Sequence, residues 1–131
     1  MKKYIIPCLL CLFFACSGPI IRNDAEIRFG EQEHDFGILN HKEAAEYRFT
    51  FSNPGETALV VSDVKSSCGC TVAEWTKTPV KPGKSGIVVI RYDAASPGTF
   101  RKEVNVYYNG PGSPVVLKIN GDVQQAQPTV N

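Results

Sequence analysis

Two cysteines separated by one glycine, Cys68-Gly69-Cys70, are the residues of this 131-residue chain whose types and spacing best suit chemistry. On an extended strand, residues two apart point the same way but lie too far apart for a disulfide, so a bridge needs a tight bend at Gly69. A disulfide that closes so short a loop removes little entropy from the unfolded chain and is easily reduced. Cys68 and Cys70 are therefore predicted to form a reducible disulfide, or alternatively to be buried, reduced packing residues.

Two further hypotheses stay open for the same cysteine pair. Soft thiolates favour Cu(I) and zinc, but a closed zinc site needs four ligands, and His34 and His41 would complete it only if the fold brought them near. The second hypothesis is a mixed disulfide with a partner protein. The sequence by itself assigns no metal site and no cofactor.

Other chemistry-bearing residues have structural interpretations. His34 and His41 have no catalytic partner at a recognisable spacing, and the motifs of serine hydrolases, zinc proteases and phosphate-binding loops do not occur. Asp35, which precedes Phe36-Gly37, is predicted to accept hydrogen bonds from turn amides. The pair Arg101-Lys102 is predicted to be a solvated strand start, with a site for an acidic glycan or lipid head group as the alternative. No catalytic residue and no small-molecule substrate are predicted, so the chain is not expected to be an enzyme.

The N-terminus has the features of a secretory signal. Lys2 and Lys3 precede an apolar run of a dozen residues that is too short to span a bilayer comfortably, and Ala15 then precedes Cys16. Phe13-Phe14-Ala15-Cys16 resembles a bacterial lipobox, whose cysteine becomes lipidated, and an ordinary signal without lipid is the alternative. The expected organisation is stated by residue ranges: a signal peptide at 1–15, a lipidated Cys16 with its tether at 16–25, one domain at 26–123 and a flexible tail at 124–131.

The charge balance excludes one class of partner. The whole chain has a formal charge of +1, and loss of the signal leaves 12 Lys and Arg against 13 Asp and Glu, a charge of −1. Nucleic-acid binding needs a clustered basic surface, so no nucleic-acid partner is expected. The expected partners are the membrane, through the lipid anchor, and a protein of the envelope.

Short alternating runs predict the fold. Apolar and polar residues alternate between turn residues over most of the mature region, which predicts an all-β, antiparallel β-sandwich of about seven to eight strands. Three connectors have the form x-Pro-Gly-x, in which glycine supplies a positive φ, and each is predicted to be a type II turn. They are Asn53-Pro54-Gly55-Glu56, Lys81-Pro82-Gly83-Lys84 and Ser96-Pro97-Gly98-Thr99.

The order of several motifs resembles a known bacterial family. The motifs include Asp35-Phe36-Gly37, Ser67-Cys68-Gly69-Cys70-Thr71 and Leu117-Lys118-Ile119-Asn120-Gly121, with the Pro-Gly turns between them. Together they resemble the family of domain of unknown function 1573, over about Ile27 to Val123. The resemblance implies an immunoglobulin-like fold of the major sperm protein type. The family is common in secreted proteins and lipoproteins of the Bacteroides group. It implies no activity.

These observations predict a non-enzymatic lipoprotein of the cell envelope, anchored in the outer membrane, with an immunoglobulin-like interaction or accessory domain. Its contact surface would be an open strand edge, which can pair with another chain, or the loop that carries Cys68-Gly69-Cys70. The alternative function is thiol–disulfide exchange or copper binding through that motif.

Overall fold

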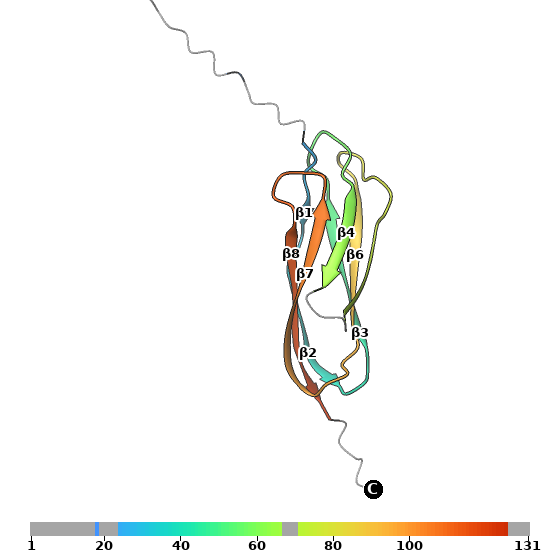
Figure 1. Ribbon diagram of the computed structural model, residues 1–131, viewed down its shortest axis with the longest axis vertical. Coiled ribbons are helices and arrows are strands. Elements are labelled where there is room, and N and C mark those ends of the chain that lie inside the picture. Colours follow the sequence, from blue (N-terminus) through green and yellow to red (C-terminus); the bar gives the residue numbers. More distant parts are fainter. Residues whose placement is uncertain (1–17, 19–23, 67–70, 126–131) are drawn as a thin grey trace, which may run out of the picture.

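The computed structural model describes residues 18, 24–66 and 71–125, and it folds them as a two-sheet sandwich (Figure 1). The first sheet has the strand order β1-β3-β6-β5, and the second has the order β2-β8-β7-β4. The strands are β1 (Arg28–Phe29), β2 (Glu33–Asn40), β3 (Ala45–Ser52), β4 (Val61–Ser66), β5 (Thr71–Trp75), β6 (Ser85–Tyr92), β7 (Gly98–Tyr108) and β8 (Val115–Gln124). The predicted all-β, immunoglobulin-like sandwich is confirmed. The strand β8 extends to Gln124, the first residue of the expected tail.

One strand pairing differs from a purely antiparallel arrangement. β1 and β2 are consecutive in sequence but belong to different sheets, because the chain crosses over at Gly30 to Gln32. After this crossing, β2 runs parallel to β8, whereas every other strand pair of the described region is antiparallel. The alternating sequence pattern shows which residues face inward but does not show the direction of the neighbouring strand.

The core lies between the two sheets and follows the alternation of the strands. Side chains two apart on each central strand point inward, and they are nearly or completely buried. They include Phe49 and Phe51 on β3, Val88 and Ile90 on β6, Val104 and Val106 on β7, and Leu117 and Ile119 on β8. Within the described residues, no helix is long and apolar enough to cross a membrane.

The structure confirms one of the predicted type II turns and corrects another. Gly83 has a φ of 77°, and the amide of Lys84 donates to the carbonyl of Lys81 at 2.9 Å, as a type II turn requires. Gly98 also has a positive φ, of 116°, but it is already the first residue of β7, so the type II turn at Ser96-Pro97-Gly98-Thr99 stays a prediction. The prediction for Asn53-Pro54-Gly55-Glu56 is wrong: Gly55 does not take a positive φ, and its amide donates instead to Oδ1 of Asn53 at 3.0 Å. A side-chain oxygen of asparagine can thus replace the backbone carbonyl of a β-turn.

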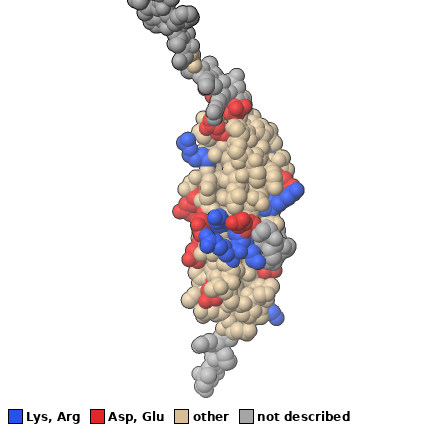
Figure 2. Space-filling view, turned by 60° about the vertical axis from the view of Figure 1, so that its left-hand side comes forward, with Lys and Arg blue, Asp and Glu red and all other residues tan. Residues whose placement is uncertain are grey.

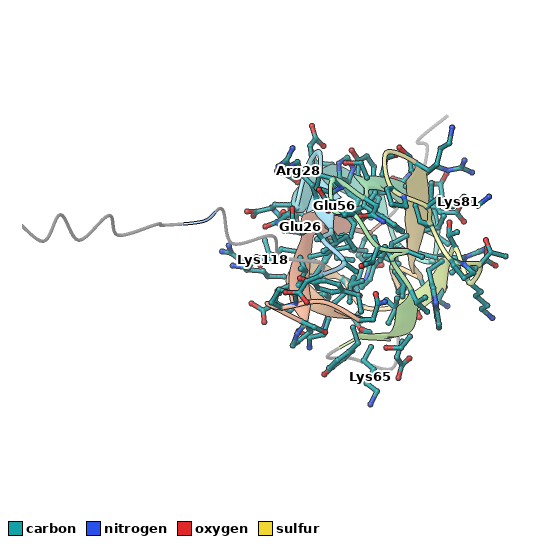
Figure 3. The ribbon with its side chains drawn as sticks, turned by 90° about the horizontal axis from the view of Figure 1, so that it is seen from above. Glu26, Arg28, Glu56, Lys65, Lys81 and Lys118 are labelled. Atoms are coloured by element: carbon teal, nitrogen blue, oxygen red, sulfur yellow. The ribbon has the colours of Figure 1, made fainter. Side chains whose placement is uncertain are left out.

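The two ends of the sandwich have different roles in the chain path. The N-terminal segment enters at one end, the entry pole, where Ala25 is buried beside Gly55 and Gly110 (Figure 1). Figure 3 looks down on this pole and shows Glu26 and Glu56 next to each other. The chain leaves at the opposite end, the far pole, where the amide of His41 donates to the carbonyl of Gln124. The entry pole therefore fixes where any N-terminal anchor is attached to the domain.

Candidate functional site

An irregularity in β2 creates the site. The pairing register between β2 and β8 shifts between Asp35 and Ile38, where Gly37 takes a φ of 67° that few other residues adopt. The carboxylate Oδ1 of Asp35 accepts the amide hydrogen of Gly37 at 2.8 Å. This bond confirms the role predicted for Asp35 as an acceptor for turn amides, and it stabilises the bulge.

The bulge changes which side chains face the solvent. Before it, Phe36 faces the core and contacts the ring of Phe100, and after it Leu39 packs against the core. The extra residue between them turns Ile38 outward, where 69% of its surface is exposed. Ile38 is the exposed large hydrophobic side chain of the described region. An exposed isoleucine beside a bulge in an edge strand is thus a direct consequence of keeping both Phe36 and Leu39 inside.

Beside the bulge, the outer face of the second sheet has a hollow of about 440 Å³. Two rows of paired residues line this hollow. In the first row, Asn120 of β8 lies between Asp35 of β2 and Arg101 of β7. In the second row, Asp122 of β8 lies between Ile38 of β2 and Thr99 of β7. The hollow thus brings residues of β2 together with residues of β7 and β8, which lie far from β2 in the sequence.

Gly121 forms the floor of the hollow. A Cβ atom at this position would lie 2.8 Å from the ring of Phe100 and 3.0 Å from the carbonyl oxygen of Gly37. Both distances are shorter than ordinary van der Waals contacts, so a larger residue would push the bulge away from β8. The glycine lets the β2 bulge lie directly against β8 and keeps the hollow in its shape.

The polar groups of the hollow are mostly hydrogen-bond acceptors. Oδ1 of Asn120 is buried and has no hydrogen-bond partner within the described part of the chain. The guanidinium of Arg101, which lines the hollow, lies 3.6 Å from the carboxylate of Glu33, which does not. Oδ2 of Asp122 accepts a hydrogen bond from the side-chain Nε2 of Gln124 at 3.3 Å. Acceptors, one guanidinium and one exposed isoleucine are groups that suit non-covalent binding.

Charged residues continue along the same outer face. In the strand register, Lys118 of β8 lies opposite Glu33 of β2 on one side and opposite Glu103 of β7 on the other. Figure 2 shows Lys, Arg, Asp and Glu gathered across the middle of this view, with further charged residues scattered toward both ends. Figure 3 shows Lys118 and Lys65 pointing outward on different sides.

The residues that the sequence singled out for chemistry lie elsewhere. Cys16, Cys68 and Cys70 fall outside the described residues, so the lipid, disulfide, thiol and metal hypotheses stay predictions. The strands that flank the cysteine motif, β4 and β5, are edge strands of different sheets. Near this motif, Lys65 pairs with Asp63 at 3.7 Å, and its ammonium lies 5.5 Å from the ring centre of Tyr107.

The two histidines make structural contacts. The ring of His34 stacks on Tyr47 of β3, with ring centres 3.6 Å apart, and the two rings are nearly parallel. Nε2 of His41 lies 3.0 Å from the carbonyl oxygen of Ala95 at the far pole. Within residues 24–66 and 71–125, no three or more His, Cys, Asp and Glu side chains form a group that could hold a metal ion.

Sequence reasoning found part of the hollow and missed the rest. It singled out Asp35 and Arg101, which the fold brings to either side of Asn120. It did not single out Ile38, Asn120 or Asp122. A glycine inside a strand pattern, as in Asp35-Phe36-Gly37, is the signal that could have indicated a bulge and an outward-facing residue after it.

Solved structures with a similar fold include proteins of varied origin. A protein of unknown function from Porphyromonas gingivalis W83 matches with a TM-score of 0.69 and 18% identity over 78% of this chain and 48% of that one. The VesB protease of Vibrio cholerae matches with a TM-score of 0.62 and 18% identity over 76% of this chain and 32% of that one. This chain thus spans about half the length of the first structure and about a third of the second.

A third similar structure has nearly the same length as the strand-forming region. The ASH/PapD-like domain 7 of human CEP192 matches with a TM-score of 0.64 and 12% identity, over 80% of this chain and 88% of that one. At these identities the likeness establishes the fold alone. A comparison with curated proteins finds no matching sequence.

The family is established by a match to a family model. The model, described as protein of unknown function (DUF1573), covers residues 27–123, which include β1 through most of β8. The resemblance seen in the sequence motifs is therefore confirmed, and the chain belongs to the DUF1573 family of immunoglobulin-like proteins of unknown function.

Proposed function

We propose that this chain is a non-enzymatic, lipid-anchored module of the cell envelope that binds another envelope protein. The observation that carries the proposal is the hollow beside the β2 bulge. Its acceptors and the exposed Ile38 are suited to holding a protein surface without making or breaking covalent bonds.

The N-terminus supports anchoring at the entry pole. Lys2, Lys3, the apolar run and Ala15-Cys16 are the features of a lipoprotein signal, and the proposed membrane is the outer membrane. Ala25 is only 1% exposed, so the domain begins close behind the lipidated cysteine. A tether from Cys16 to Asp24 reaches about 30 Å at about 3.3 Å per residue. The domain would therefore work close to the membrane surface.

The position of the hollow relative to the entry pole favours contact with a partner. Thr99 follows the first residue of β7, and Asp122 lies near the last residue of β8, where both strands reach the far pole. The hollow is thus nearer to the far pole than to the end that carries the anchor. A lipid-anchored chain would present this surface away from its own membrane.

Two measurements test the proposal. The intact mass of the chain recovered from membranes should show an N-terminal Cys16 that carries acyl chains, and a Cys16→Ser variant should be released from the membrane. A photo-reactive amino acid placed at Ile38, and in a separate variant at exposed Glu74 on the other sheet, should give a cross-link to an envelope protein in intact cells from at least one of the two positions. Unlipidated chains, no cross-link from either position, or catalytic turnover by the purified chain would contradict the proposal.

A further inference from the structure

We propose that the hollow binds a basic side chain, lysine or arginine, from an extended segment of the partner, and that an apolar neighbour of that side chain packs on Ile38. This inference rests on the proposed function and specifies the chemistry of the partner.

The first argument is the charge of the hollow. Asp35 and Asp122 both line it, and neither forms an ion pair with another described residue. The positive charge of Arg101 is matched by Glu33, which lies 3.6 Å away. The two carboxylates of the hollow thus outnumber its one guanidinium, which is paired with Glu33, and a cationic group is the ligand that this arrangement attracts.

The second argument is the acceptor that lacks a donor. Oδ1 of Asn120 is buried without a partner, and buried side-chain oxygens usually accept a hydrogen bond. The strand register places Asn120 directly beside Asp35, and Asp122 lies two residues further along β8 on the same face. A lysine ammonium has three donors and an arginine guanidinium has five, so either group can bind more than one acceptor at once, and it would reach Oδ1 of Asn120 after that side chain turns toward the hollow.

The third argument is the exposed isoleucine. The side chain of Ile38 lies across the second row of the hollow from Thr99, with Asp122 between them. A ligand that carries only a charge would leave this apolar surface in water. A segment with an apolar residue next to the basic one would cover both parts of the hollow.

Two other classes of ligand fit less well. Sugars are commonly held by stacking on an exposed aromatic ring, but the ring of Phe100 lies under the floor, 9% exposed and stacked on Tyr92 at 3.9 Å. Anionic ligands would meet the carboxylates of Asp35 and Asp122 and would compete with Glu33 for Arg101. The acidic balance of the hollow therefore favours a cation over an anion.

The test is a titration of the isotope-labelled full chain, in detergent micelles with reductant, followed through backbone amide resonances. The probes are four capped tripeptides, Ile-X-Ile, in which X is arginine, lysine, glutamate or neutral citrulline. The arginine and lysine peptides should shift the amides of residues 35–38, 99–101 and 120–122 in a saturable way, and added salt should weaken the effect. The glutamate and citrulline peptides should bind at least about tenfold more weakly.

Two variants sharpen the result. Asp122→Asn and Asp35→Asn should each lower the affinity of the chain for the arginine peptide by about tenfold. The asparagine at position 35 can still accept the amide hydrogen of Gly37. Asp93→Asn is the matched control, because the carboxylate of Asp93 accepts the amide hydrogen of Ala95 in the same kind of turn, outside the hollow. This control should bind the arginine peptide like the unmodified chain.

Several results would overturn the inference. One is that the citrulline peptide binds as tightly as the arginine peptide. Another is that the arginine and lysine peptides do not shift the amide resonances of the hollow. A third is that these amides respond more strongly to calcium chloride than to any peptide. In cells, a cross-link from Glu74 and none from Ile38 would overturn it while leaving the proposed interaction function intact. Absence of both cross-links would instead contradict the proposed function.

Discussion

The side-chain amide of Asn53 donates a hydrogen bond to the carbonyl oxygen of Val80 at 2.9 Å, inside the protein. The same amide nitrogen donates to the carbonyl of Thr57, and Oδ1 accepts the amide hydrogen of Gly55. Asn53 is completely buried, and its contacts join the end of β3 to the segment that leads into β6. One polar side chain thus organises two connections at the entry pole.

Asn53→Ala is expected to lower the free energy of unfolding by about 2–4 kcal/mol, because it leaves buried backbone groups without partners. Urea denaturation followed by the fluorescence of Trp75, the one tryptophan, measures the change. Asn109→Ala is the control: Asn109 also binds two backbone groups, but at an exposed position, and its loss is expected to cost only about 1 kcal/mol. If both variants lost the same free energy of unfolding, burial would not explain the contribution of Asn53.

Gly110→Ala is expected to destabilise the domain by about 1–3 kcal/mol, because a Cβ at this position would collide with the carbonyl oxygen of Ala25 and with the ring of Tyr108. Gly30→Ala is the matched control, since no atom lies within 4 Å of the added Cβ. Thermal melting of both variants measures the difference. If the two melted alike, the close packing of Ala25 under the β7–β8 connection would be wrong.

Lys42→Gly is expected to stabilise the protein by about 0.5–1 kcal/mol. Lys42 has a φ of 65°, a conformation that costs free energy for any residue with a Cβ, and its amide donates to Ala94 at 2.8 Å. Lys42→Ala keeps the Cβ and is expected to give no such gain. Ala94→Gly relieves a similar φ of 53° but loses a buried methyl group, so we expect it to be close to neutral. The urea midpoints of the three variants, compared with that of the unmodified chain, test this prediction. A midpoint for Lys42→Gly that is no higher than that for Lys42→Ala would contradict it.

The pKa of Tyr47 is raised above its usual value of 10.0, first because its hydroxyl donates a hydrogen bond to Glu31 at 2.7 Å. Since the folded pKa lies above the unfolded one, this contribution to stability is complete below pH 10 and is lost as the pH rises through the raised pKa. Glu31→Ala should lower the pKa of Tyr47 toward 10.0, and Glu33→Ala should leave it unchanged. Titration of labelled tyrosine rings by NMR tests this, and an unaltered titration in Glu31→Ala would contradict it.

Cys68→Ser combined with Cys70→Ser is expected to change the free energy of unfolding by no more than about 1.5 kcal/mol, because the loop between the two cysteines is so short. Thiol trapping in glutathione buffers, followed by intact mass, measures whether the pair forms a disulfide. Reversible formation near about −200 mV is the behaviour of exchange proteins and would favour the redox alternative. Thiols that react only after unfolding would identify the two cysteines as packing residues.

The candidate site was only partly predictable from the sequence. Asp35-Phe36-Gly37 contains the acceptor and the glycine of the bulge, and a local hydrogen bond between residues two apart can be anticipated from their types. The position of Asn120 beside Asp35 could not be anticipated, because it depends on β2 leaving the first sheet and pairing in parallel with β8. The exposure of Ile38 also follows from that pairing, since only the register shift shows which face each residue takes.

The sequence by itself determined the strand pattern, the type II turn at Gly83, the family and the absence of a recognisable catalytic motif, because these depend on residue types at short spacing. Phe49, Phe51 and Ile90 were buried as their alternation indicated, since a strand has only two faces. The tertiary structure alone decided which strands became neighbours, and so it decided that Asp35, Asn120 and Asp122 form one acidic hollow. The physical reason is that pairing between distant strands depends on the packing of the whole core, which no short segment encodes.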